Sequence, residues 1–170
     1  MGRINNTPKI KDNQMVNVRR SDIGQRAEWL FYMYKAAKEK GVDLEEIARN
    51  GIYEVGCVRG DEMMKDMRDK SDLQELCKCY YENLPGMKAF EKTIEKDTPE
   101  EFIMDFHYCP LVAAWQKHTD DEELIKKLCD IAMDGDRGIF SRVPGAEFHL
   151  DSTIASGAPV CRLRMTKKAE

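Results

Sequence analysis

The first half of the chain repeats apolar residues at helical spacing. Polar residues 1–19 predict a loose arm that could order against a partner. Apolar residues then recur every three or four positions in three stretches, and these predict three helices that begin near Ser21, Asp43 and Ser71. Glycines weaken the second of these helices, so the pattern predicts a break near Gly60.

The pattern changes after Leu84-Pro85-Gly86, which ends the third helix. Alternation with period two predicts strands, the first two of them paired as a hairpin by the turn at 97–100. Pro110 suits the first position of a helix, and a further helix or two follow it. The predicted strands cover residues 88–96, 102–109, 146–154 and 160–166.

This order of elements predicts an α+β fold, because strands joined by short turns make an antiparallel sheet that helices can cover. We expect a sheet of about four strands with an N-terminal helical segment. The expected organisation is an arm and helices at 1–84, an α+β catalytic or ligand-binding core at 85–166 and a tail at 167–170, all in one compact unit.

Composition narrows the classes of function. The 170 residues are 42% hydrophobic and 34% charged, which is typical of a globular chain, and the net charge of −4 argues against nucleic acid as a partner. No apolar run approaches the roughly 20 residues of a membrane span. The N-terminal residues lack the apolar core of a secretion signal, so we expect a cytoplasmic protein.

Six cysteines in 170 residues are too few for a disulfide scaffold, so we expect free thiols in a reducing compartment. Neither CxxC nor HExxH occurs, and we expect no metal and no other cofactor. Spacing alone leaves open a scattered metal site built from His107, Cys109, Cys129 and Cys161.

The segment around Cys109 is the most informative for chemistry. If it is a strand, His107 and Cys109 point to one face, and Cys109 falls at the start of the next helix. The free N–H groups and the positive end of a helix dipole favour a thiolate there, and a nearby imidazole could move protons. The alternative is that Cys109 is a buried packing residue and His107 a polar edge residue.

The second candidate is the sequence DGDRG at 134–138. Its glycines allow close approach to a ligand, while Asp136 could orient a histidine or a water and Arg137 could grip a carboxylate. The alternative is a helix end followed by a capped turn, with both side chains solvated.

Three segments follow one another in the second half of the chain: HYCPLVAAW at 107–115, CDIAMDGDRG at 129–138 and TIASGAPVCRLR at 153–164. They resemble the L-2-amino-thiazoline-4-carboxylic acid hydrolase family, and the resemblance covers residues 85–166. The fold is also distantly similar to vinyl-reductase-like small-molecule-binding domains, which implies a pocket between sheet and helices.

The resemblance implies a hydrolase of non-peptide C–N bonds that opens a cyclic amidine on the way to cysteine by a carbamoyl intermediate. From their positions, Cys109 is the candidate nucleophile, His107 the general base and acid, and Asp136 an orienting carboxylate. Arg137 or Arg164 could hold the substrate carboxylate. Two further residues of the matched segments are assigned to substrate binding: Trp115 and Cys161.

A second function remains open, in which the same pocket only binds a small molecule and the protein is a sensor or an accessory subunit. The N-terminal helices are rich in Met and aromatic residues and could form a homodimer interface. In either case the expected partner is a small molecule.

Overall fold

Helices and strands alternate in groups along the chain, in a computed structural model that describes residues 4–82 and 88–168. The helices are α1 (Gln14–Glu39), α2 (Glu45–Lys65), α3 (Leu73–Glu82), α4 (Pro110–Trp115), α5 (Glu122–Ala132) and α6 (Asp134–Ser141). The strands are β1 (Lys92–Asp97), β2 (Glu101–Phe106), β3 (Ala146–Ser152) and β4 (Cys161–Lys167). The predicted α+β fold is confirmed.

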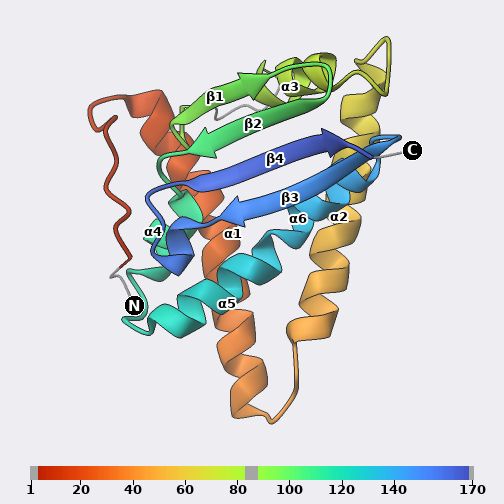
Figure 1. Ribbon diagram of the computed structural model, residues 1–170. Coiled ribbons are helices and arrows are strands. Elements are labelled where there is room, and N and C mark those ends of the chain that lie inside the picture. Colours follow the sequence, from red (N-terminus) through yellow and green to blue (C-terminus); the bar gives the residue numbers. More distant parts are fainter. Residues whose placement is uncertain (1–3, 83–87, 169–170) are drawn as a thin grey trace.

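The four strands form one antiparallel sheet in the order β1-β2-β4-β3, and the helices lie on one side of it (Figure 1). Alternate residues of the two central strands face the helices and are fully buried, among them Phe102, Met104, Leu163 and Met165. In the register of β2 and β4, Phe102 lies opposite Met165 and Met104 lies opposite Leu163, so these pairs are the sheet's contribution to the hydrophobic core.

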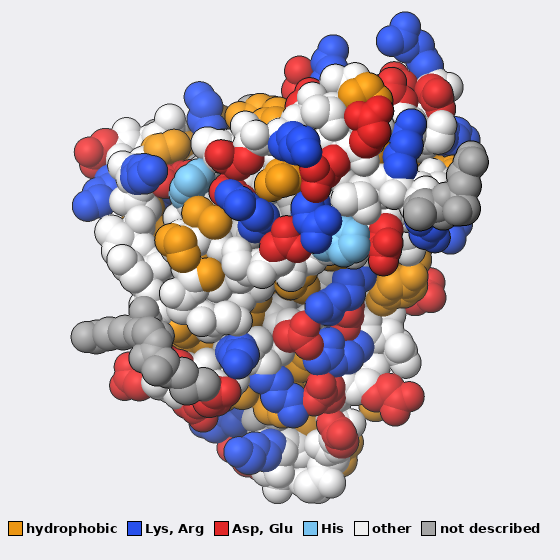
Figure 2. Space-filling model, in the orientation of Figure 1, with side chains coloured by type: hydrophobic (Ala, Val, Ile, Leu, Met, Phe, Trp, Pro, Cys, Tyr) orange, Lys and Arg blue, Asp and Glu red, His pale blue; other side chains and the backbone are white. Residues whose placement is uncertain are grey.

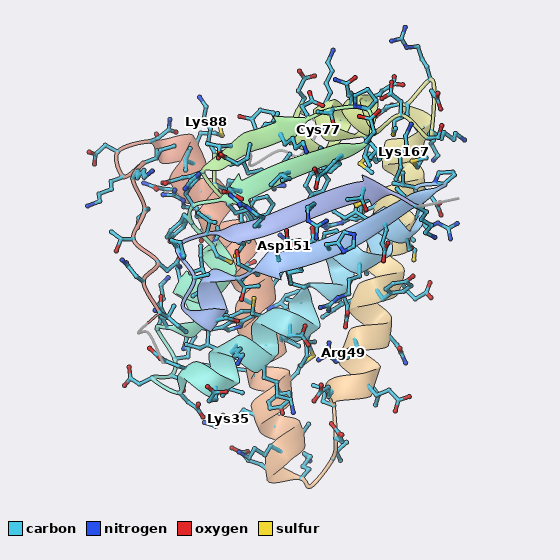
Figure 3. The ribbon with its side chains drawn as sticks, in the orientation of Figure 1. Lys35, Arg49, Cys77, Lys88, Asp151 and Lys167 are labelled. Carbon is cyan, nitrogen blue, oxygen red and sulfur yellow. The ribbon has the colours of Figure 1, made fainter. Side chains whose placement is uncertain are left out.

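The other face of the sheet is charged. Arg162 on β4 makes a bidentate ion pair with Asp105 on β2, with N–O distances of 2.8 and 2.7 Å. Arg164 does the same with Asp151 on β3, at 2.8 and 3.0 Å. Figure 2 shows acidic and basic side chains interspersed over this face, and Figure 3 labels Asp151 on it. This face therefore contributes ion pairs and little apolar packing.

Helices α2 and α6 pack closely against each other at glycine residues. A Cβ at Gly56 would overlap the carbonyl oxygen of Gly135 and lie 3.0 Å from the Cα of Gly138. A Cβ at Gly60 would lie 2.5 Å from the carbonyl oxygen of Ile139. The expected break near Gly60 is wrong, because α2 continues to Lys65 and its glycines let the two backbones touch. The DGDRG segment is correspondingly a helix rather than a turn.

The first helix begins earlier than the hydrophobic pattern indicates. It starts at Gln14, because the Asn13 side chain accepts a hydrogen bond from the Val16 N–H at 3.1 Å and caps it. The arm before it is ordered against its own chain: the N–H groups of Lys9 and Ile10 donate to the Glu91 carboxylate at 3.1 and 2.8 Å.

The other predicted elements agree with the structure to within a few residues. Asp72 caps α3, Pro110 opens α4, Asp121 caps α5, and β1 and β2 form the predicted hairpin. The strand predicted at 146–154 is shorter, because Ile154 already belongs to a 3₁₀ turn, η1 (Ile154–Ser156). The predicted stop at Leu84-Pro85-Gly86 lies outside the described residues.

Candidate functional site

Cys109 lies at the N-cap of α4 and is buried, with 6% of its surface exposed. Asn6 of the arm holds its backbone, accepting from the Cys109 N–H at 2.9 Å and donating to its carbonyl at 2.8 Å. Burial raises the pKa of the thiol to about 11, although the N–H groups of Val112 and Leu111 act in the opposite direction. The helix start is where the sequence predicts it, but desolvation outweighs its effect and the thiol is protonated at neutral pH.

His107 has a different neighbour. Its Nε2 lies 2.9 Å from the Oγ1 of Thr93, whose Cα partner in the register is Asp105. Within residues 4–82 and 88–168, no hydrogen bond joins His107 to Cys109. The structure therefore does not bring the imidazole and the thiol together.

Asp136 in the first turn of α6 accepts a hydrogen bond from the hydroxyl of Tyr80 on α3 at 2.6 Å. Burial raises the pKa of Asp136, while the Tyr80 hydrogen bond and the charge of Lys92 lower it. The Asp136 charge in turn raises the pKa of Cys109. The two residues from separate predicted motifs thus lie within electrostatic reach of each other.

Cys129 and Cys161 lie near Cys109. Both are buried at 5% exposure, and burial raises the pKa of each, with the Cys109 charge as a further cause. The Sγ of Cys161 also accepts a hydrogen bond from the Ile154 N–H at 3.2 Å. Cys109 of one family-like segment thus acts electrostatically on the cysteines of the other two, and all six cysteines of the chain are free.

Lys92, which no motif singled out, lies against the Tyr80–Asp136 pair. Its residue is 7% exposed, and its Nζ lies 4.4 Å from the ring centroid of Tyr80 and 4.5 Å from that of Phe106. Burial lowers the pKa of Lys92 to about 8, against the opposing effect of Asp136. Its position in the sequence could have identified it, because Lys92 lies between Phe90 and Ile94 on the same predicted apolar face of a strand.

Two of the residues assigned to substrate binding have other partners. Arg137 pairs with Asp130 at 2.7 Å and with Asp134 at 2.6 Å. The same two carboxylates bind Arg49 of α2, labelled in Figure 3. Arg164 lies on the charged face of the sheet in its pair with Asp151.

Trp115 is fully buried and donates its indole N–H to the carbonyl of Ala27 at 2.8 Å. This bond fastens α4 to α1, so the residue packs two helices together.

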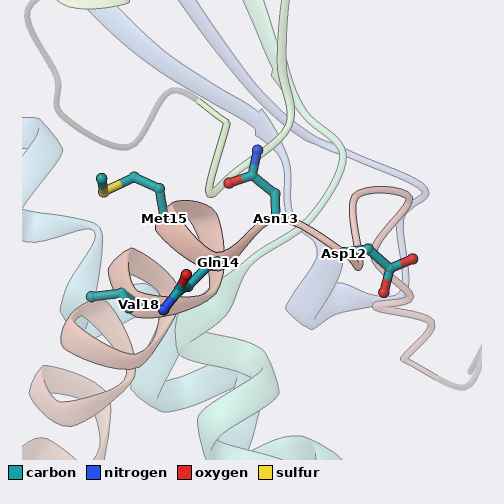
Figure 4. Close-up of a pocket in the computed structure, with 5 residues that line it drawn as sticks. All are labelled: Asp12, Asn13, Gln14, Met15 and Val18. Atoms are coloured by element: carbon teal, nitrogen blue, oxygen red, sulfur yellow. The ribbon is translucent and has the colours of Figure 1, made fainter.

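Two open hollows lie on the surface, and Cys109 lines neither of them. One surrounds the start of α1 and is lined by Asp12, Asn13, Gln14, Met15 and Val18 (Figure 4). The other lies beside β3 and has Arg137 among its lining residues, with Tyr53, Ser141, Glu147 and Lys168. In the described part of the chain, no group of three or more His, Cys, Asp or Glu side chains could hold a metal ion. No helix described there is long and apolar enough to cross a membrane.

A model of the L-2-amino-thiazoline-4-carboxylic acid hydrolase family matches residues 23–165. The chain belongs to this family. The match starts in α1, so it extends well before the segments at 85–166 that carry the resemblance in the sequence and includes the N-terminal helices. The family name describes a hydrolase, and the residues that would perform the reaction follow only from the geometry above.

Among solved structures, the chain is similar to a trafficking protein particle complex subunit 3 from Naegleria fowleri, described as covalently bound to palmitic acid. The two are 14% identical, with a TM-score of 0.57, and the alignment covers 88% of this chain and 97% of the other. At this identity the likeness concerns the fold. No curated protein matches the chain.

Proposed function

We propose that this protein hydrolyses a small cyclic amidine of the 2-amino-thiazoline-4-carboxylate type. Water adds at the amidine carbon C2 and the ring bond from C2 to sulfur breaks, so the product carries a carbamoyl group and a free thiol. The ring bond that breaks in this proposal is therefore a C–S bond, not the C–N bond that the family resemblance implies. The reaction needs a nucleophile at C2, a proton for the departing sulfur and a group that holds the amidine.

The observation that carries the proposal is the partly buried Asp136 carboxyl, which accepts a hydrogen bond from Tyr80 and lies within electrostatic reach of Cys109. A protonated amidine is a planar cation with parallel N–H donors, which matches the two oxygens of a carboxylate. Asp136 is the orienting group in this proposal. It would hold the amidine so that C2 faces the thiol of Cys109, the proposed nucleophile.

The thiol must lose a proton before its sulfur can bond to C2, and its pKa of about 11 makes a proton acceptor necessary. The pair of Cys109 with His107 stays a prediction, because the contact of the imidazole joins its Nε2 to Thr93 and not to the thiol. After the C2–S ring bond breaks, the departing sulfur takes a proton and C2 stays bonded to the Cys109 sulfur as an isothiourea. Water then adds at C2 and the bond from C2 to the Cys109 sulfur breaks, so the water oxygen becomes the carbamoyl oxygen and Cys109 regains its proton.

The direct test incubates the purified protein with L-2-amino-thiazoline-4-carboxylate between pH 6 and 9. The small-molecule fraction is then separated by filtration and assayed for a new thiol and, by mass, for the addition of one water. We expect thiol release by the wild type and its loss in Cys109→Ala. Cys77→Ala is the matched control, because Cys77 is also a buried free thiol but lies in α3.

The outcomes separate the activity from the assignment of the nucleophile. If the wild type releases no thiol over this pH range, the hydrolase proposal fails. If Cys109→Ala releases thiol as fast as Cys77→Ala, the activity stands and Cys109 is not the nucleophile.

A non-catalytic binding domain is the second candidate. The observation that favours it is the fold, which this chain shares with a subunit described as covalently bound to palmitic acid. In that subunit, a fold of this kind holds a small molecule. Intact-mass measurement of the protein as purified, before and after denaturation, distinguishes the two: a retained ligand without turnover supports the binding domain.

We also propose a homodimer through the N-terminal helices, in a reducing cytoplasm that keeps the six thiols free. Its support is a set of large apolar side chains left exposed along α1 and α2: Met15, Trp29, Met33, Ile47, Val55 and Val58. Residues 15, 29 and 33 share one face of α1, because they are separated by multiples of the helical repeat.

A further inference from the structure

The N-terminal segment, residues 4–10, lies against Cys109. It has no regular secondary structure, and Figure 1 shows it beside α4 at the edge of the molecule. The amide side chain of Asn6 bonds to both backbone groups of Cys109: it accepts from the N–H at 2.9 Å and donates to the carbonyl at 2.8 Å. These bonds join residues 103 positions apart, so they hold the segment directly on the candidate nucleophile.

Glu91 anchors the end of the segment that leads into α1. The N–H groups of Lys9 and Ile10 donate to its carboxylate at 3.1 and 2.8 Å, and Arg20 of α1 donates to it at 2.8 Å. Glu91 has a φ of 52°, the one positive φ of a non-glycine residue in the described part of the chain. A residue with a Cβ is strained in this conformation, and such strain often accompanies function. Here the strained residue is the one whose carboxylate holds the segment.

The other end of the segment is attached through Ile4. Its N–H donates to the Glu122 carboxylate in the first turn of α5 at 3.0 Å, and its side chain is buried in the same apolar cluster as Cys109. Ile4 is the one buried residue of the segment, because positions 5, 7 and 9 are exposed and positions 6, 8 and 10 are half-buried. A segment held by polar bonds and one buried side chain can open locally while the rest of the domain stays folded.

We propose that residues 4–10 form a strap that moves away from Cys109 to admit a small molecule. With the strap closed, 6% of Cys109 is exposed and the residue lines neither surface hollow, so a substrate has no open path to its sulfur. Asn6 fastens the strap at Cys109, and Glu91 fastens it at the end near α1. The inference rests on the proposed function for the role of Cys109 as nucleophile, but access to the thiol is measured without it.

The test measures the rate at which iodoacetamide alkylates each cysteine of the full chain, by mass spectrometry of the digested protein. All rates are taken at about pH 9, because the thiolate is the reacting form. Four proteins are compared: wild type, Asn6→Ala, Glu91→Gly and Asn5→Ala. Asn5→Ala is the matched control, because Asn5 is the exposed neighbour of Asn6 and its side chain accepts a hydrogen bond from Thr7. Cys77 is the internal control in every protein, since it is a buried thiol of α3.

We expect Asn6→Ala to raise the alkylation rate of Cys109 about tenfold, because two hydrogen bonds that keep the strap closed are lost and the rate follows the population of the open form. Glu91→Gly should raise the same rate at least about threefold, although it leaves Asn6 and Cys109 in place. Glycine adopts a positive φ without strain, so this variant keeps the turn before β1. The Cys77 rate should equal that of the wild type in every variant, and Asn5→Ala should leave the Cys109 rate unchanged.

The outcomes separate movement of the strap from a local or a global effect. A Cys109 rate that neither Asn6→Ala nor Glu91→Gly changes overturns the strap. A rise in one of these variants alone also overturns it, because opening of one segment must respond to both fastenings. An equal rise at Cys77 overturns it as well, since the whole domain is then opening. None of these rates depends on turnover, so failure of the hydrolase proposal leaves the strap standing, and failure of the strap leaves the hydrolase proposal standing.

Discussion

Replacement of Gly56 by alanine tests the close contact between α2 and α6, the helix that carries Asp136. Gly56 packs against Gly135 and Gly138, the two glycines that bracket Asp136 in α6. The added Cβ would overlap a backbone oxygen, which cannot rotate away as a side chain could. The two helices must therefore separate, and α6 carries Asp136 with it away from its hydrogen bond to Tyr80.

The size of the effect follows from two opposing contributions. Forcing a methyl group into a close-packed contact costs about 1–3 kcal/mol, and the clash with backbone favours the upper part of this range. Alanine in place of glycine inside a helix returns about 1 kcal/mol. We therefore expect Gly56→Ala to lower the free energy of unfolding by about 2 kcal/mol, which lowers Tm by about 4–8 °C in a chain of this size.

Gly51 is the matched control on the same helix, because a Cβ there would meet nothing within 4 Å. Gly51→Ala gains the helical contribution without the clash, so its Tm should rise by about 2–4 °C. Thermal unfolding followed by circular dichroism, with urea unfolding as a second measure, compares the two variants. If Gly56→Ala is as stable as Gly51→Ala, the close contact of α2 and α6 is wrong.

Three further predictions concern the site and the helices. The pKa of Lys92 is lower in the folded protein than in the unfolded chain, so between about pH 8 and 10.5 the unfolded chain holds a proton that the folded protein has lost. Lys92→Met should therefore stabilise the protein by up to about 3 kcal/mol at pH 7. Urea unfolding should show this gain shrinking as the pH rises to about 10.5. Alkylation of Cys109 by iodoacetamide in the folded protein should have its midpoint near pH 11, and a midpoint near the ordinary value of about 8.5 would contradict the buried environment. Trp29→Glu should weaken the proposed dimer about 30-fold or more in sedimentation velocity, as loss of a buried aromatic anchor does, whereas a wild type that is monomeric at all concentrations would refute the dimer.

The hydrophobic pattern was sufficient for the fold because each signal it uses is local. Strand alternation at Phe102, Met104 and Phe106 depends only on which face of the sheet is buried, and Pro110 acts on its own backbone. Gly56 and Gly60 were misread for the same reason: helix propensity treats glycine as a weakness, and only the partner helix α6 makes its missing side chain useful. That contact joins residues about 80 positions apart, which no local pattern records.

The candidate site was predicted only in part, for a related reason. Asp136 and Cys109 were chosen from separate motifs, and the structure brings them within electrostatic reach. The pairing of His107 with Cys109 assumed that β2 continues to residue 109, but the strand ends at Phe106. Arg137 was chosen for its position beside Asp136, yet successive helical residues point in different directions, and its side chain turns to Asp130.

Lys92 shows why a residue outside every motif carries information about function. Its pKa of about 8 against an ordinary 10.5 corresponds to a cost of about 3 kcal/mol when the charged form is buried at neutral pH. A methionine or leucine would fill the same aromatic surroundings without this cost, so packing alone does not explain a lysine there. An anion bound beside the ammonium would raise the pKa of Lys92 again, so Lys92 would take up a proton near pH 8 when the anion binds. The free energy lost by burying the unpaired charge would then be recovered as affinity for the anion.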